Sequence, residues 1–432
     1  MRSVWLTLTS LVFLVAQLSA QSVPTATLTS SVPMFAAELG AEVAIGGSTI
    51  VSPTIYQPGS PQDVAIFVYT KPANKPWTDM TESARLLPPS GVGFGVYGSA
   101  ISGDGNTIAG VSTISDFVYV YTKPAGGWHG VVYPVAVLVP GQPVKPWIIQ
   151  GKIRSIAMNS KGDTIVAGAY DAGTQGHTSE GKGVPGVIEA GAAYVWVKPS
   201  GGWAQTNPIV TVATLTASDG VSYDHFGWAV GVSANTIVIG APANGGNNGS
   251  HLGAAYLFQR PAAGIWHDRS KFTSKFTASD PKVLDVFGYS VAIGNSGALV
   301  AVGSGRGCNS ALGSAYVFDR PSPWWPTEVT QTAEVFPSDS SVNSCFGLNV
   351  TVGDQQVLVG AQQTMTSYGA VYAFSRSAAG WTNLSLPAAL TGISGSFFGY
   401  SEAVSGTATI VGSPGVSLNG NNGAGAIYLF EN

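Results

Sequence analysis

The chain has 432 residues, of which 45% are hydrophobic and only 10% are charged, and its formal net charge is −4. With 56 glycines, this composition is typical of a protein rich in β-strands and turns. Because there is no excess of basic residues to neutralise phosphates, the composition argues against nucleic acid as a partner.

The first twenty residues have the pattern of a secretory signal peptide. Arg2 precedes an apolar stretch from Val4 to Ala16, and Ala20 offers a small residue for cleavage. No other apolar run reaches the roughly eighteen residues that a membrane span requires. We therefore expect residues 1–20 to be removed and the rest to be secreted, into a periplasm, onto the cell surface or out of the cell, with no transmembrane segment.

Residues 21–432 contain a four-part repeat. Its copies begin at Phe-Gly pairs, or at degenerate versions of them, near residues 39, 94, 153, 226, 287, 346 and 398. Each copy has an apolar run such as GWAVGV, a short turn rich in Gly, Asn and Asp, and a second apolar run such as TIVIGAP. A third run, a turn such as KPAGG and a fourth run such as VATLTASD follow. The turns suit tight hairpins between antiparallel strands.

Aromatic residues recur at fixed places of the repeat. The third runs carry pairs whose spacing of two puts both rings on one strand face: Phe67/Tyr69, Tyr119/Tyr121, Tyr194/Trp196, Tyr256/Phe258, Tyr316/Phe318, Tyr372/Phe374 and Tyr428/Phe430. A Trp follows the next turn: Trp77, Trp128, Trp203, Trp266, Trp324 or Trp325, and Trp381. Their regular recurrence predicts that these rings pack between sheets rather than stack on sugars.

Seven copies of four short strands predict an all-β fold, a seven-bladed β-propeller of four-stranded antiparallel blades. The last copy stops after its third run, at Phe430. The segment TATLTSS, Thr25 to Ser31, matches the fourth-run phrase VATLTAS at 212–218. We expect this N-terminal strand to complete the last blade, which closes the ring and removes its open edges.

The recurring Phe-Gly and Gly-Ala-Pro phrases resemble FG-GAP repeats, the blade unit of the integrin α-subunit propeller and of many bacterial exported proteins. The tight turn between the first two runs is similar to that of the short bacterial variant. The resemblance implies an adhesion or recognition module. Integrin-like repeats carry an acidic calcium loop at this turn, whereas SAN, GNSG and GDQQ lack its carboxylates, so we expect no metal and no cofactor.

One face of the predicted propeller carries the candidate ligand site. The loops from second to third strands, and from each fourth strand to the next blade, emerge there. In the third and fourth blades these loops hold Asp171, His177, Glu180, Asp224, His225 and His251. Function concentrates in long loops on rigid scaffolds, so these residues are the candidate ligand-binding surface. Their irregular spacing matches no metal or catalytic motif.

The two cysteines, Cys308 and Cys345, fall in loops of the same face at the fifth and sixth blades. In an oxidising compartment an even number of cysteines indicates a disulfide, and we predict that these two are bonded. Two free buried thiols are the alternative.

Taken together, these features predict an exported, monomeric, non-enzymatic module that binds a protein or a glycan through this loop face. One alternative is a hydrolase or lyase that acts on polysaccharide with the acidic and His side chains of that face. A second alternative is a structural protein of the cell envelope.

Overall fold

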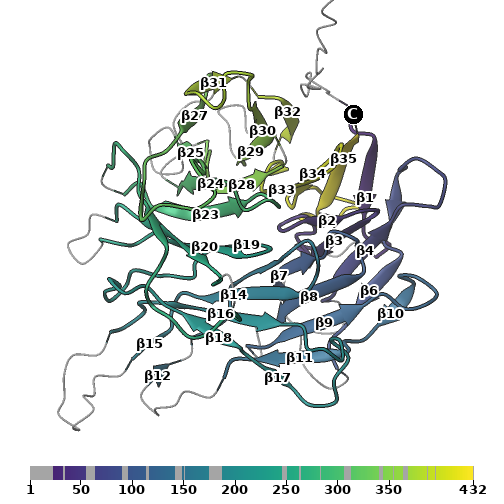
Figure 1. Cartoon of the computed structure of the whole chain (residues 1–432). Coiled ribbons are helices and arrows are strands. Elements are labelled where there is room, and N and C mark those ends of the chain that lie inside the picture. Colours follow the sequence, from purple (N-terminus) through teal and green to yellow (C-terminus); the bar gives the residue numbers. More distant parts are fainter. Residues whose placement is uncertain are drawn as a thin grey trace, which may run out of the picture.

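The computed structural model describes residues 23–32, 35–54, 64–89, 96–112, 116–141, 148–149, 151–174, 187–245, 251–261, 264–282, 284–305, 313–339, 344–353, 355–362, 368–386, 388–394 and 396–431. Seven sheets of four or five strands are arranged as the blades of a closed ring (Figure 1), which confirms the predicted seven-bladed propeller. We number the blades 1 to 7 in the order of their Phe-Gly strands. Within the described part of the chain, no helix has the length and apolar composition that a membrane span requires.

Each blade has the strand order 1-2-3-4 from the middle of the ring outward. The first strands are β2 (Ala44–Gly46), β7 (Val96–Ile101), β13 (Ser155–Met158), β19 (Val230–Ser233), β23 (Phe287–Ile293), β28 (Asn349–Val352) and β33 (Ser401–Ser405). The second strands are β3 (Thr49–Pro53), β8 (Thr107–Ser112), β14 (Thr164–Ala169), β20 (Thr236–Ala241), β24 (Leu299–Ser304), β29 (Gln356–Ala361) and β34 (Ala408–Ser413).

The two outer sets of strands complete the antiparallel sheets. The third strands are β4 (Ile66–Thr70), β9 (Val118–Thr122), β16 (Ala192–Val197), β21 (Ala254–Gln259), β25 (Ser314–Asp319), β30 (Tyr368–Ser375) and β35 (Ala426–Glu431). The fourth strands are β6 (Ala84–Leu86), β11 (Ala136–Val139), β18 (Ala213–Leu215), β22 (Ser274–Phe276), β27 (Ala333–Pro337), β32 (Leu390–Ser394) and β1 (Ala26–Thr29).

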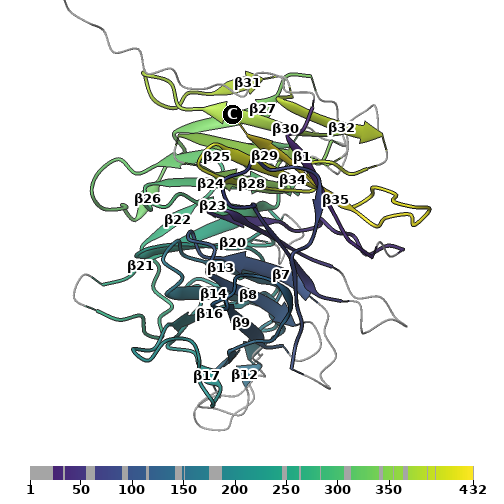
Figure 2. The same ribbon diagram turned by 90° about the vertical axis from the view of Figure 1, so that its right-hand side faces the viewer.

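The N-terminal strand closes the ring as predicted. β1 pairs antiparallel with β35, with Ala26 opposite Leu429 and Leu28 opposite Ile427. Figures 1 and 2 show these two strands side by side in views turned by 90°. Blade 7 is therefore built from both ends of the described chain.

A fifth strand, which the sequence did not reveal, covers the outer edge of five blades. It comes from the segment after the Trp of the following blade and runs parallel to the fourth strand. These strands are β5 (Met80–Thr81), β10 (Gly130–Val132), β17 (Ile209–Val210), β26 (Glu328–Val329) and β31 (Leu384–Leu386). In blade 3 a single parallel bridge between Leu215 and Arg269 replaces it. A separate short hairpin pairs β12 (Ile148–Ile149) with β15 (Gly173–Thr174).

Burial along the strands explains their composition. All six residues of β20, TIVIGA, are buried, because neighbouring blades cover both faces of an inner strand. In β6 and β22 only alternate residues are buried, as expected for strands nearer the rim.

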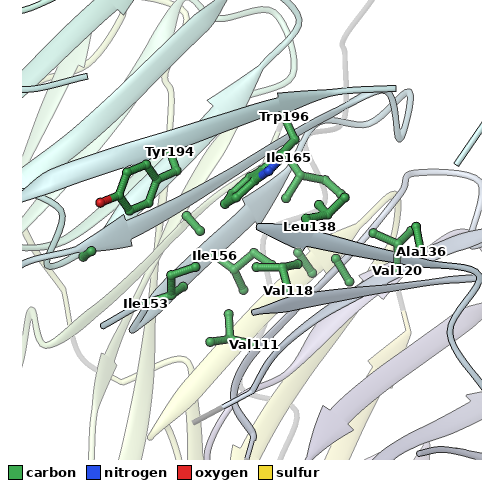
Figure 3. Packing of buried hydrophobic residues seen from close by; sticks show 14 of the residues in the cluster. Val111, Val118, Val120, Ala136, Leu138, Ile153, Ile156, Ile165, Tyr194 and Trp196 are labelled. Atoms are coloured by element: carbon green, nitrogen blue, oxygen red, sulfur yellow. The ribbon is translucent and has the colours of Figure 1, made fainter. Parts of the chain in front are cut away.

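The buried apolar side chains of the described residues form seven clusters, one at each interface between adjacent blades. Figure 3 shows the cluster between blades 2 and 3, where Val118 and Leu138 face Ile165 and Trp196. The Phe of the Phe-Gly pair belongs to this core. Phe226, for example, lies 5.4 Å from the ring of Tyr256 and 6.1 Å from that of Phe258, measured between centroids.

Glycines permit a close backbone approach between blades. Gly253 precedes the third strand of blade 4 and forms a parallel bridge with Phe287 of blade 5. A Cβ atom at Gly253 would lie 2.1 Å from the carbonyl oxygen of Phe287. The side of one blade therefore docks on the Phe-Gly backbone of the next.

Candidate functional site

The upper face of the propeller carries the loops from second to third strands and those from each fourth strand to the next blade. Four of the six predicted ligand-binding residues, Asp171, Asp224, His225 and His251, lie there in the described residues. His177 and Glu180 lie outside the described residues. The opposite, lower face carries the hairpin turns between first and second strands and the loops between third and fourth strands.

The side chain of Asp224 stabilises the local backbone. It is 1% exposed, and its Oδ2 accepts hydrogen bonds from the backbone N–H of Val221, at 2.9 Å, and from Nδ2 of Asn244, at 2.8 Å. Asp285 occupies the same place before the next Phe-Gly pair, is also buried, and accepts a hydrogen bond from the N–H of Lys282. The recurrence indicates that this carboxylate closes the turn that leads into a blade.

His225 is placed beside a carboxylate that the sequence had not singled out. Its Nε2 lies 3.1 Å from Oε2 of Glu189, whose side chain is 40% exposed. The backbone φ of His225 is +57°. His225 thus pairs with Glu189 rather than with Asp171 or Asp224.

His225 is part of a continuous aromatic cluster on the upper face, which we define as Tyr170, His225, Trp228 and Tyr289. The ring centroids of Tyr170 and His225 are 5.3 Å apart, and those of Tyr170 and Trp228 are 4.8 Å apart. Trp228 lies 5.2 Å from Tyr289 of the next blade. All four side chains are partly exposed. The cluster therefore presents aromatic surface from three consecutive blades, 3, 4 and 5.

Tyr400 of blade 7 lies close to one end of this cluster. Burial and, second, the nearby hydroxyl of Tyr400 raise the pKa of Tyr289. Burial and the carboxylate of Glu38 raise the pKa of Tyr400, whose side chain is 43% exposed. Both phenols consequently remain neutral hydrogen-bond donors at physiological pH.

Asp171 and His251 form hydrogen bonds with residues outside the aromatic cluster. Oδ1 of Asp171 accepts a hydrogen bond of 2.7 Å from the backbone N–H of Lys152. The carbonyl of His251 accepts a hydrogen bond of 3.0 Å from the N–H of Val286. Across the described ranges, no three His, Cys, Asp or Glu side chains are grouped so that they could hold a metal ion.

The family follows from the repeats themselves. Residues 209–258 and 271–318 match the model of the FG-GAP repeat. These segments run from β17 to β21 and from the approach to β22 to β25, and the same strand sequence recurs around the whole ring. The chain is an FG-GAP repeat β-propeller protein. No curated protein matches it.

In this FG-GAP propeller the signature residues belong to the scaffold. The repeat Trp residues are buried; at blade 5 the buried one is Trp325, while Trp324 is 66% exposed. Nε1 of Trp128, Trp203 and Trp325 donates to a glycine carbonyl in the hairpin turn of the same blade, at 2.8 to 2.9 Å. The prediction that these rings pack between sheets is confirmed.

Asp104 shows what a carboxylate does in the short hairpin turn of an FG-GAP blade. Its Oδ1 accepts hydrogen bonds from the hydroxyl of Ser102 and from the N–H of Asn106, which also lower its pKa. The carboxylate thereby stabilises the turn.

Three of the partly exposed aromatic residues that sequence reasoning missed share one position in the repeat. Trp228, Tyr289 and Tyr400 each follow a Phe-Gly pair directly, whereas blade 6 has Leu348 and blade 1 has Ala41 at this place. The sequence did contain a signal for them, because the residue after the Phe-Gly pair is aromatic in only some blades. A packing requirement common to all blades would select the same type of residue in every blade.

Two further features of the FG-GAP ring involve its innermost strands. The lower mouth of the channel is a cavity of about 420 Å³, lined by Ile45, Ile101, Met158, Val352 and Val404 among others. Glu402, on the innermost strand of blade 7, is 3% exposed, and burial raises its pKa to about 8. Glu402 faces the blade interface and contacts Asn349 of blade 6.

Cys345 immediately precedes the Phe-Gly pair of blade 6 and is 5% exposed. Its predicted partner, Cys308, lies outside the described residues. The disulfide stays a prediction.

Proposed function

We propose that this FG-GAP propeller is an exported, non-enzymatic binding module that recognises a glycan through the aromatic cluster on its upper face. The proposal rests on a continuous set of partly exposed rings that three blades contribute: Tyr170, His225, Trp228 and Tyr289. The rigid ring holds these side chains in place without a large loss of conformational entropy on binding.

The chemistry of the cluster suits a saccharide. The apolar C–H face of a sugar ring packs against aromatic rings, while its hydroxyl groups require donors and acceptors at the edge. Tyr289 and Tyr400 supply neutral hydroxyls, and Glu189 supplies a carboxylate beside His225. Binding alone requires these contacts and no catalytic acid–base pair.

The test is affinity electrophoresis on gels that contain xylan, barley β-glucan or galactomannan. We expect at least one polysaccharide to retard the wild-type protein, and Trp228→Ala and Tyr289→Ala to lose about 1–3 kcal/mol of binding, a loss of roughly fivefold to 150-fold in affinity. Trp324→Ala is the matched control, because Trp324 is exposed on the lower face and should leave retardation unchanged.

Three outcomes would count against the proposal. Absence of retardation with every polysaccharide would contradict it, and so would equal loss in the Trp324 control. Release of reducing sugar by the wild-type protein, abolished in Asp171→Ala or His225→Ala, would favour the hydrolase or lyase alternative.

Export and the disulfide belong to the same proposal. Residues 1–20 act as the leader, so N-terminal sequencing of protein from the medium or periplasm should begin at Gln21. Cys308 and Cys345 are bonded, so thiol titration of the unfolded, unreduced protein should detect no free thiol. A mature chain that begins at Met1, or two titratable thiols, would contradict these parts.

A further inference from the structure

A basic groove lies on the lower face, between blades 1 and 2 and opposite the aromatic cluster. The loops between third and fourth strands of these blades enclose a volume of about 870 Å³. Its charged lining consists of Lys71, Lys75, Lys123 and Glu431, with His129 at its side. The uncharged lining includes the hydroxyls of Ser48, Thr70 and Ser83.

The repeat explains why cations gather on this face. In six blades a basic residue directly follows the third strand: Lys71, Lys123, Lys198, Arg260, Arg320 and Arg376. The backbone N–H of each donates to the hairpin turn of its own blade, as Lys71 does to Ser48 and Lys123 to Asn106. This recurring hydrogen bond places the six residues at equivalent points of the lower face. In the sequence of blade 7 this position is Asn432, and the residue before it is Glu431.

The lysine side chains that line the groove outnumber its carboxylates. Nζ of Lys71 lies 2.7 Å from Oε1 of Glu431. Lys75 and Lys123 form no ion pair with any residue that the structure describes. Three ammonium groups against one carboxylate leave the groove with a charge of +2, although the whole chain carries −4. Like charges repel each other across such a groove unless an anion enters it.

The same construction recurs between blades 4 and 5. A groove of about 390 Å³ is lined there by Arg260, Arg320 and the exposed Trp324. Two adjacent blades again contribute the cation that follows the third strand. The grooves are thus a product of the repeat, and the one between blades 1 and 2 is the larger.

We infer that the groove between blades 1 and 2 binds an anionic saccharide, through carboxylate or sulfate groups that reach Lys75 and Lys123. Hydroxyl side chains beside the cations match the hydroxyls of a sugar. The loop tip Pro72-Ala73-Asn74 offers no large apolar side chain that would insert into a bilayer. The described lining of the groove also lacks an exposed Trp, Tyr or Phe ring on which a nucleic acid base could stack, because Trp128 in its lining is fully buried.

This site would give the protein a second contact with polysaccharide, independent of the aromatic cluster. A ligand held on the lower face leaves the upper face free. The propeller could therefore bridge an acidic polymer and a second ligand at the same time.

The test measures binding of the full mature chain to polygalacturonate and to dextran sulfate at low ionic strength, with neutral dextran as the blank. Lys75→Gln combined with Lys123→Gln should weaken binding to at least one of the two polymers roughly tenfold. Glu431→Gln should strengthen it several-fold, because it frees the ammonium of Lys71. A merely structural role would not produce opposite effects from these variants.

Lys271→Gln is the matched control, since it removes one exposed charge outside the groove. Trp228→Ala, which tests the upper face, should leave binding of the acidic polymers unchanged. Unaltered binding in the double Lys variant, equal loss in Lys271→Gln, or binding to vesicles of anionic phospholipid but to neither polymer would overturn the inference.

Discussion

Glu402 shows how a single buried carboxyl group makes the stability of the ring depend on pH. Its Oε2 accepts a hydrogen bond of 3.0 Å from Nδ2 of Asn349, while Oε1 is buried without a partner in the described residues. Burial raises its pKa from 4.5 to about 8, against the smaller opposing effect of its hydrogen bonds. The folded chain therefore holds a proton that the unfolded chain releases near pH 4.5.

The sign of the pH effect follows from this difference. The contribution of Glu402 to the free energy of unfolding is fully present below about pH 4.5. It is lost as the pH rises from there through 8, by up to about 1.4 kcal/mol per pH unit. In urea unfolding between pH 5 and pH 9, Glu402→Gln should reduce this slope and be the more stable protein at pH 9. Part of the slope remains, because burial also raises the pKa of Glu42 to about 8.

Glu328→Gln serves as a control, since it alters an exposed carboxylate on β26 and should keep the wild-type slope. A Glu402→Gln protein with an unchanged pH profile would show that Glu402 is ionised in the folded ring.

The backbone conformation before the Phe-Gly pair, or its degenerate version, of five blades could not be predicted from residue types. Glu38, His225, Val286, Cys345 and Phe397 all have positive φ, between +46° and +57°. Glycine is the residue that adopts this conformation freely, and none of the five positions holds one. In these five blades the fold imposes the geometry through the turn that enters the blade, so the position of His225 reflects the scaffold as much as any ligand.

At the scale of the strand, the close approach of neighbouring blades makes a steric prediction. A Cβ atom at Gly240 of β20 would lie 2.0 Å from the carbonyl oxygen of Gly288 in blade 5. Gly240→Ala should therefore lower the free energy of unfolding by about 2 kcal/mol or more, because two backbones must separate. Gly126→Ala is the control, since nothing lies within 4 Å of a Cβ there. Equal unfolding midpoints for the two variants would contradict the close packing.

The repeat Trp residues allow a second comparison between equivalent positions. Nε1 of Trp203 donates a hydrogen bond of 2.8 Å to the carbonyl of Gly162, whereas Nε1 of Trp266 is buried without a partner in the described residues. Trp→Phe removes similar packing at both sites. Trp203→Phe should cost about 1 kcal/mol more than Trp266→Phe in denaturant unfolding. The reverse order would show that the indole hydrogen bond contributes nothing to the hairpin turn.

The inner strands could be read from the sequence because blade after blade repeats their apolar runs and turns. β20, with the sequence TIVIGA, is flanked by a hairpin turn and by Pro242, which ends it. The fifth strands could not be read in this way. β5 and β26 have two residues each and no periodic pattern, and they pair with a blade that precedes them by a whole repeat.

For the whole molecule, the sequence located the upper-face loops but not the cluster within them. Asp171, Asp224 and His225 were correctly placed on these loops. Distances between blades decide which side chains meet, and sequence spacing does not encode them. Trp228 and Tyr289 are sixty-one positions apart, yet their rings are 5.2 Å apart because each stands at the entrance of adjacent first strands.

Closure of the ring is the feature on which all seven interfaces depend, because each blade relies on two neighbours. Ala26 and Leu28 of β1 are buried in the cluster between blades 7 and 1, and β1 also pairs with β5. A chain that lacks residues 1–31 would expose the outer edge of β35 and leave β5 without a partner. We expect it to unfold at a markedly lower temperature and to aggregate.

The same truncated chain provides the decisive measurement, because the missing strand can be returned as a peptide. A synthetic peptide of residues 23–32 should raise the melting temperature of the truncated chain in a concentration-dependent manner, as binding to the folded state alone requires. The matched peptide with Leu28→Asp should fail, since Leu28 is fully buried and a carboxylate there would have to lose its hydration. If the truncated chain melts like the full mature protein, or if both peptides stabilise it equally, then the pairing of β1 with β35 is not what holds the ring closed.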